Sequence, residues 1–133
     1  MKYLLDTHTL IWSILDIEKL SPEVRNIIEN PKNEIFVSGI SFWEIAIKAQ
    51  LGKFNFGGIN IILIPNIAKD YGFNIISPDS YDFITYGELP QVEDHRDPFD
   101  RMLIHTAISN DLIIISKDQW FKKYKEFGLL QLW

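Results

Sequence analysis

Acidic side chains at the head of one predicted helix are the residues of this sequence most able to do chemistry. The stretch from His95 to Ala107 places Asp97 and Asp100 just before a run of apolar residues. Asp97 has the character of a helix N-cap, Pro98 suits the first helical position, and Asp100 falls in the first turn, where an acid is favoured. Because a well-capped helix explains this pattern equally well, its meaning depends on where the other acids lie.

Three further acids stand at the ends or beginnings of predicted elements. Asp6 directly follows a short apolar run, Asp118 follows the strongest apolar run in the chain, and Glu44 lies in the first turn of a helix expected from Ser41. In a parallel sheet the carboxyl ends of the strands share one edge, so these acids can converge there with Asp100. Converging acids stay ionised together only around positive charge. For an all-oxygen site Mg²⁺ or Mn²⁺ is the usual solution.

Each of these acids also has a purely structural interpretation. Glu44 comes three residues after Ser41 and fits a capping box. Asp118 can cap a short following helix, and Asp6 can do so only if a helix begins immediately after it. The hydroxyls of Thr7 and Ser116 can orient carboxylates from behind or serve as ordinary turn residues.

The elements that must position these acids alternate between strands and helices. Strands are expected at 3–5, 34–38, 73–76 and 112–116, with an edge strand at 129–133. Helices are expected at 10–15, 22–28, 41–48, 81–88, 98–108 and 120–124. The apolar run 59–64 fits a strand or a helix by its length, and we favour a helix that continues to Lys69. The alternation predicts an α/β fold with a mostly parallel central sheet sandwiched between helices.

Composition narrows the class of protein. A length of 133 residues with 47% apolar residues suits a single domain spanning 1–133. The absence of cysteine excludes disulfides and thiolate metal sites. The apolar run at the N-terminus is too short for a signal peptide and no stretch could span a bilayer, so a cytoplasmic protein without membrane contact is expected. The net charge of −5 argues against a broad basic nucleic-acid surface, but not against binding through metal ions.

The ordered set of motifs resembles the PIN-domain nucleases, and within them the VapC-type toxins of bacterial and archaeal toxin–antitoxin pairs. The motifs are Leu4-Leu5-Asp6-Thr7-His8, Ser41-Phe42-Trp43-Glu44-Ile45, Arg96-Asp97-Pro98-Phe99-Asp100-Arg101-Met102-Leu103 and Ser116-Lys117-Asp118. The resemblance implies a PIN-like three-layer sandwich and a metal-dependent endoribonuclease. It also implies that the metal-binding and catalytic quartet is Asp6, Glu44, Asp100 and Asp118, with Asp97 as an auxiliary acid.

The same resemblance implies the partners. These are an RNA substrate, a homodimer, and an antitoxin that inserts a basic residue among the acids. The candidates for RNA phosphate contacts are Lys48, Arg96, Arg101 and Lys117, each of which is otherwise a solvated surface charge. For His8, His95 and His105 we favour solvent-exposed or structural roles. The aromatic residues near the motifs favour core packing or a contact with another chain over base stacking.

Two other functions are compatible with the acids. In a non-catalytic interaction module the quartet would bind a metal or a basic peptide without turnover. In an aspartyl-nucleophile phosphatase Asp6 would be the nucleophile, but that chemistry usually has a second acid two residues later, where this sequence has His8.

Overall fold

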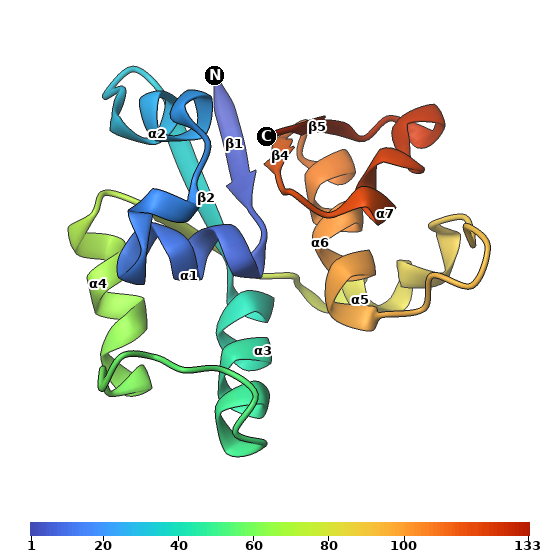
Figure 1. Ribbon diagram of the computed structural model, residues 1–133. Coiled ribbons are helices and arrows are strands. Elements are labelled where there is room, and N and C mark those ends of the chain that lie inside the picture. Colours follow the sequence, from blue (N-terminus) through green and yellow to red (C-terminus); the bar gives the residue numbers. More distant parts are fainter.

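A five-stranded parallel sheet forms the centre of the molecule, in a computed structural model that describes residues 1–133 (Figure 1). The strand order is β3-β2-β1-β4-β5, and every neighbouring pair is parallel. The strands are β1 (Lys2–Leu5), β2 (Glu34–Ser38), β3 (Asn74–Ile76), β4 (Ile113–Ile115) and β5 (Leu130–Leu132). Because β1 is central, the residue that follows it lies in the middle of the carboxyl edge.

Helices connect the strands. They are α1 (Thr7–Leu15), α2 (Pro22–Glu29), α3 (Gly39–Gln50), α4 (Ile64–Asp70), α5 (Ser80–Ile84), α6 (Pro98–Ser109) and α7 (Gln119–Lys122). Short 3₁₀ turns cover Ile17–Lys19, Ile61–Leu63, Tyr86–Glu88 and Lys125–Phe127. None of the helices is long and apolar enough to cross a membrane.

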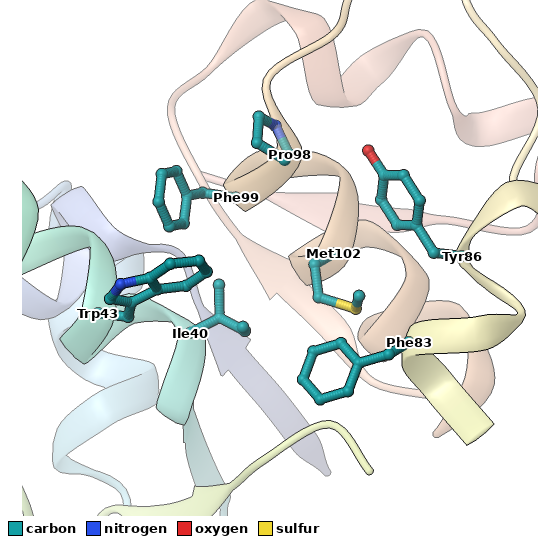
Figure 2. Close-up of a pocket in the computed structure, with 7 residues that line it drawn as sticks. All are labelled: Ile40, Trp43, Phe83, Tyr86, Pro98, Phe99 and Met102. Atoms are coloured by element: carbon teal, nitrogen blue, oxygen red, sulfur yellow. The ribbon is translucent and has the colours of Figure 1, made fainter. Parts of the chain in front are cut away.

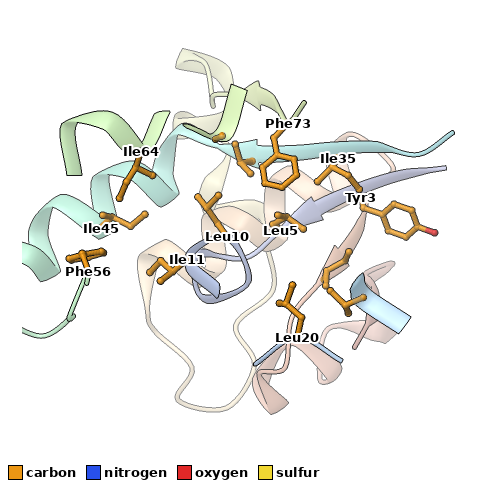
Figure 3. Packing of buried hydrophobic residues seen from close by; sticks show 14 residues of the cluster. Tyr3, Leu5, Leu10, Ile11, Leu20, Ile35, Ile45, Phe56, Ile64 and Phe73 are labelled. Carbon is orange, nitrogen blue, oxygen red and sulfur yellow. The ribbon is translucent and has the colours of Figure 1, made fainter. Parts of the chain in front are cut away.

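Alternation along the strands divides the core into two layers. Tyr3 and Leu5 of β1 point into one layer with residues of α1 to α4, which Figure 3 shows from close by. Leu4 points into the other layer, where α6 supplies Leu103 and Ile104. Since the side chains of a strand alternate between faces, both faces of the sheet are covered. The predicted α/β three-layer sandwich is therefore confirmed.

Several predicted boundaries differ from the structure. The first helix begins at Thr7 rather than Leu10, and α3 begins at Gly39 rather than Ser41, so both start directly where a strand ends. The helix preferred for the run from residue 59 is present as a 3₁₀ turn and α4, and the edge strand near the C-terminus is also present. The helix predicted over 81–88 is divided into α5 and a 3₁₀ turn, with Thr85 between them.

Candidate active site

Asp6 lies at the end of the central strand and is almost completely buried. It caps α1 by accepting a 2.7 Å hydrogen bond from the Thr9 amide, so the structural role that required a helix immediately after it is present. The Ser116 hydroxyl, from the end of β4, donates to its other oxygen, as an orienting group would. Burial raises the pKa of Asp6, and the hydrogen bond from Ser116 offsets part of that rise.

Glu44 is buried inside α3 and does not cap it. The N-cap is Ser38, whose hydroxyl accepts from the Ile40 amide, so the capping-box interpretation of Ser41 and Glu44 is wrong. The Lys48 ammonium lies 2.6 Å from a carboxylate oxygen of Glu44, one helical turn further on. Glu44 is therefore free of a backbone role and is paired with the only cation that the structure places against it.

Ser41 has a different partner from the one expected. Its hydroxyl accepts a 3.0 Å hydrogen bond from Thr7, which joins the first turn of α1 to α3. The Thr7 hydroxyl thus donates to Ser41 and not to a carboxylate in this structure, and its role in orienting a carboxylate stays a prediction. The bond instead fixes the distance between the helices that carry Asp6 and Glu44.

The remaining acids belong to the starts of α6 and α7. Asp97 caps α6 by accepting from the Phe99 and Asp100 amides, at 2.9 and 3.1 Å, while Asp100 makes no capping bond. Asp118 caps α7 by accepting a hydrogen bond from the Trp120 amide, and its own amide donates to Ser116 Oγ. Of the two acids that begin α6, Asp100 is the one with a carboxylate not already committed to the backbone.

The pKa of Asp100 reflects the proximity of the other acids. Burial, and after it the neighbouring negative charges, together raise its pKa from 3.8 to about 8. Those charges belong to Asp97, Asp118, Glu44 and Asp6. The carboxylates predicted from the sequence therefore converge closely enough to oppose the ionisation of Asp100.

His95 is the site residue that the sequence did not reveal. It is buried, with Nε2 3.1 Å from Asp100 Oδ2 and Nδ1 2.8 Å from the Tyr124 hydroxyl. Its ring stacks on Trp120, with centroids 4.9 Å apart and planes 10° apart. Burial lowers the pKa of His95, although the charges of Asp118 and Asp97 act in the opposite direction. The only signal in the sequence is its place two residues before the helix cap, and we had favoured a solvent-exposed or structural role.

Both the sequence and the fold of this chain are similar to known proteins. The family model described as "PIN domain" matches residues 3–126. The chain belongs to the PIN domain family. No curated protein gives a significant match to the sequence of this PIN domain.

Solved structures share its fold at low sequence identity. A chain of VapBC2 from Rickettsia felis bound to a DNA fragment from their promoter has 18% identity and a TM-score of 0.66, covering 99% of this chain and 98% of that chain. A chain of VapBC-1 from nontypeable Haemophilus influenzae has 19% identity and a TM-score of 0.65, covering 99% and 97%. A chain of DNA-bound VapBC from Salmonella typhimurium has 16% identity and a TM-score of 0.64, again covering 99% and 97%.

The basic residues of this PIN domain differ in how free they are. Arg101 is buried and donates to the Tyr86 and Tyr124 hydroxyls and to the carbonyls of Leu89 and Pro90. The prediction that Arg101 contacts RNA phosphate is therefore wrong, because its guanidinium has no exposed face to offer. Lys48 is held by Glu44. Arg96 and Lys117 are exposed and stay predictions as phosphate contacts.

The acids of the PIN domain fit a hard divalent cation in charge and in donor type. Carboxylate oxygens are the ligands that Mg²⁺ and Mn²⁺ prefer, and a cation among them would relieve the repulsion that raises the pKa of Asp100. As the side chains lie, no three Asp, Glu or His groups are close enough together to hold a metal ion. Binding an ion would therefore involve reorientation of side chains, including release of Glu44 from Lys48.

An apolar pocket of about 280 Å³ is lined by residues of α3, α5 and α6, and two of these helices also carry Glu44 and Asp100. Figure 2 shows Trp43 of α3 and Phe99 of α6 together on one side of it, opposite Phe83 and Tyr86. The rings of Trp43 and Phe99 are in edge-to-face contact, with centroids 5.3 Å apart. These residues directly neighbour Glu44 and Asp100 in the sequence, and Trp43 is 60% exposed. The full lining is Ile40, Trp43, Phe83, Tyr86, Pro98, Phe99 and Met102.

Proposed function

We propose that this PIN domain is a Mg²⁺- or Mn²⁺-dependent endoribonuclease that acts as the toxin of a toxin–antitoxin pair. Membership of the PIN domain family supports a nuclease role in general. The observation that carries the specific proposal is the convergence of the acids on Asp100, whose pKa they help to raise to about 8. A set of buried acids that oppose one another's ionisation is costly to keep unless it binds a cation.

In this proposal Asp6, Glu44, Asp100 and Asp118 hold the metal. The ion, when bound, lowers the pKa of a water and neutralises the charge that develops on the phosphate oxygens. The chain's own residues supply orientation. Ser116 and the Thr9 amide fix the two oxygens of Asp6, and His95 contacts one oxygen of Asp100. Arg96 and Lys117 remain the candidates to bind the RNA backbone beside the acids.

The antitoxin in this proposal docks in the apolar pocket and blocks the acids. An apolar side chain would enter between the Trp43–Phe99 pair on one side and Phe83 and Tyr86 on the other. An Arg or Lys beside it would pair with carboxylates that otherwise bind metal. Inhibition should then compete with metal, so that excess Mg²⁺ or Mn²⁺ weakens the complex. A two-fold homodimer would place two such sites along one RNA groove, as the resemblance to VapC toxins implies.

Cleavage of RNA by the purified protein tests the enzyme. We expect cleavage of a mixed-sequence RNA with Mg²⁺ or Mn²⁺, none with EDTA, and none by the Asp6→Asn variant. Asp94→Asn, which alters an exposed loop acid, is the matched control and should cleave like wild type. Failure of Asp6→Asn to reduce cleavage would contradict the assignment of the site.

A non-catalytic binding module is the second candidate, because no three acids are placed to hold a metal and Lys48 already neutralises Glu44. Absence of cleavage on every RNA tried, together with metal binding by calorimetry, would favour it.

The toxin role is tested by expression. Growth arrest caused by the chain alone, relieved by its neighbouring gene and absent for Asp6→Asn, is the expected outcome. If expression is harmless while the purified protein cuts RNA, the chain is a housekeeping nuclease and the toxin proposal fails.

A further inference from the structure

We propose that Arg101 and Tyr124 fix the tautomer of His95 with its proton on Nε2, and that His95 thereby acts as a positioning residue for Asp100. The importance of Asp100 rests on the function proposed above, but the direction of these hydrogen bonds does not. The observation behind the proposal is a continuous buried chain of contacts from Arg101 through Tyr124 and His95 to the Asp100 carboxylate.

Arg101 determines which atom donates at one end of this series of hydrogen bonds. A guanidinium can only donate hydrogen bonds. Its Nη1 lies 3.0 Å from the Tyr124 hydroxyl and 3.1 Å from the Pro90 carbonyl, while Nη2 donates to the Leu89 carbonyl and Nε to the Tyr86 hydroxyl. These four hydrogen bonds fix the orientation of the guanidinium relative to Tyr124. The Tyr124 oxygen must therefore act as an acceptor toward Arg101.

Tyr124, which accepts from Arg101, is left to donate its hydroxyl hydrogen to His95. The residue is completely buried, and its hydroxyl has one hydrogen to donate. The partner for that hydrogen is His95 Nδ1, at 2.8 Å. If Nδ1 carried a hydrogen instead, the hydroxyl would accept from both neighbours and its own hydrogen would be buried without an acceptor, which costs free energy. Nδ1 is therefore the acceptor.

The proton of the neutral imidazole then lies on Nε2, which faces Asp100 Oδ2 at 3.1 Å. In this tautomer His95 donates to the carboxylate, whereas the other tautomer would direct a lone pair at it. Stacking against Trp120 restricts rotation of the ring about its bond to the chain. The backbone of His95 is held as well, since its amide donates to the Val92 carbonyl and its carbonyl accepts from the Gln91 side chain.

Nitrogen NMR of the histidine rings tests the direction of the chain without any assay of activity. The protein is labelled with ¹⁵N-histidine and studied metal-free at pH 7.5, and the His95 signals are identified by their loss in His95→Gln. We expect the Nε2–H tautomer in wild type. We expect a shift toward the Nδ1–H form in Tyr124→Phe, which removes only the hydroxyl. Tyr3→Phe, at a buried tyrosine outside the site, should leave the signals unchanged.

Two results would overturn the proposal. One is a wild-type ring in the Nδ1–H or doubly protonated form, and the other is an unchanged tautomer in Tyr124→Phe. The first result needs only the wild-type spectrum, so it can be obtained even if Tyr124→Phe does not fold.

The second test concerns the positioning of Asp100. Loss of a group that orients a metal-binding residue typically reduces metal affinity or activity by about 10- to 100-fold. We expect a loss of this size in Mn²⁺ affinity, measured by calorimetry, for His95→Leu, and a smaller loss for His95→Gln, whose amide can still donate to Asp100. Equal losses in both variants would show that His95 acts only by packing. If wild type binds Mn²⁺ but cuts no RNA, the proposed nuclease fails while the positioning role stands.

Discussion

Replacing Asp100 by Asn should stabilise the metal-free protein, by an amount that grows with pH. The native pKa of about 8 lies above the ordinary value of 3.8, so between these pH values the native state keeps a proton that the unfolded state has lost. Stability contributed by this group is thus complete below pH 3.8 and is lost as the pH rises toward 8. At about 1.4 kcal/mol per pH unit the whole loss is at most about 6 kcal/mol.

The observed effect should be smaller than this limit. The Asp100 side chain keeps 22% of its surface exposed, and water there screens the neighbouring charges. We therefore expect Asp100→Asn to be about 2–3 kcal/mol more stable than wild type at pH 8.5 and nearly equal to it at pH 4.5. An Asn oxygen can still accept from His95, so the substitution removes the charge and keeps the contact.

Urea unfolding in EDTA at half-unit pH steps from 4.5 to 9 measures this difference. Asp94→Asn, at an exposed loop acid, is the control and should follow wild type across the range. A constant difference between Asp100→Asn and wild type at all pH values would refute the electrostatic reasoning. So would a variant less stable than wild type at pH 8.5.

Three further predictions follow from the same structure. Millimolar Mg²⁺ or Mn²⁺ should raise the melting temperature of wild type but barely change that of the Asp6→Asn, Asp100→Asn double variant, because a ligand stabilises the state that binds it; equal shifts in both would place the ion elsewhere. Arg101→Met should lower the free energy of unfolding in urea by about 3 kcal/mol, since buried hydroxyl and carbonyl acceptors lose their donor; a loss below about 1 kcal/mol would mean that water replaces the guanidinium. Ser38→Ala should cost about 1 kcal/mol through loss of the α3 cap, and no loss would contradict that capping role.

Local signals in the sequence predicted some features well. The start of α6 could be predicted because Asp97 and Pro98 act on their own turn. The helices α1 and α3 begin earlier than predicted. The first three residues of α1 are polar, so its apolar pattern starts only at Leu10, and α3 begins with Gly39, a residue that disfavours helix. A helix that is capped by the last residue of a strand, or by the next one, gives no gap in the sequence to mark the change.

Contacts between distant segments could not be predicted. The position of His95 against Asp100 depends on Tyr124 and Trp120, which come from the C-terminal part of the chain. The burial of Arg101 depends on the loop that carries Leu89 and Pro90. The convergence of the acids could be inferred because the carboxyl edge of a parallel sheet is a property of the whole fold. The pairing of Glu44 with Lys48 has the spacing of an ordinary helix pair, and its burial comes from the packing of α3.

The position of β1 between β2 and β4 has a consequence for protein synthesis. Asp6 leaves the ribosome 110 residues before the Ser116 hydroxyl that orients it, and β4 must pair with β1 to deliver that hydroxyl. Contacts this distant in sequence form late in folding. A nascent chain that has emerged only as far as α6 has neither Ser116 nor Asp118, so the set of acids is incomplete until Asp118 has left the ribosome.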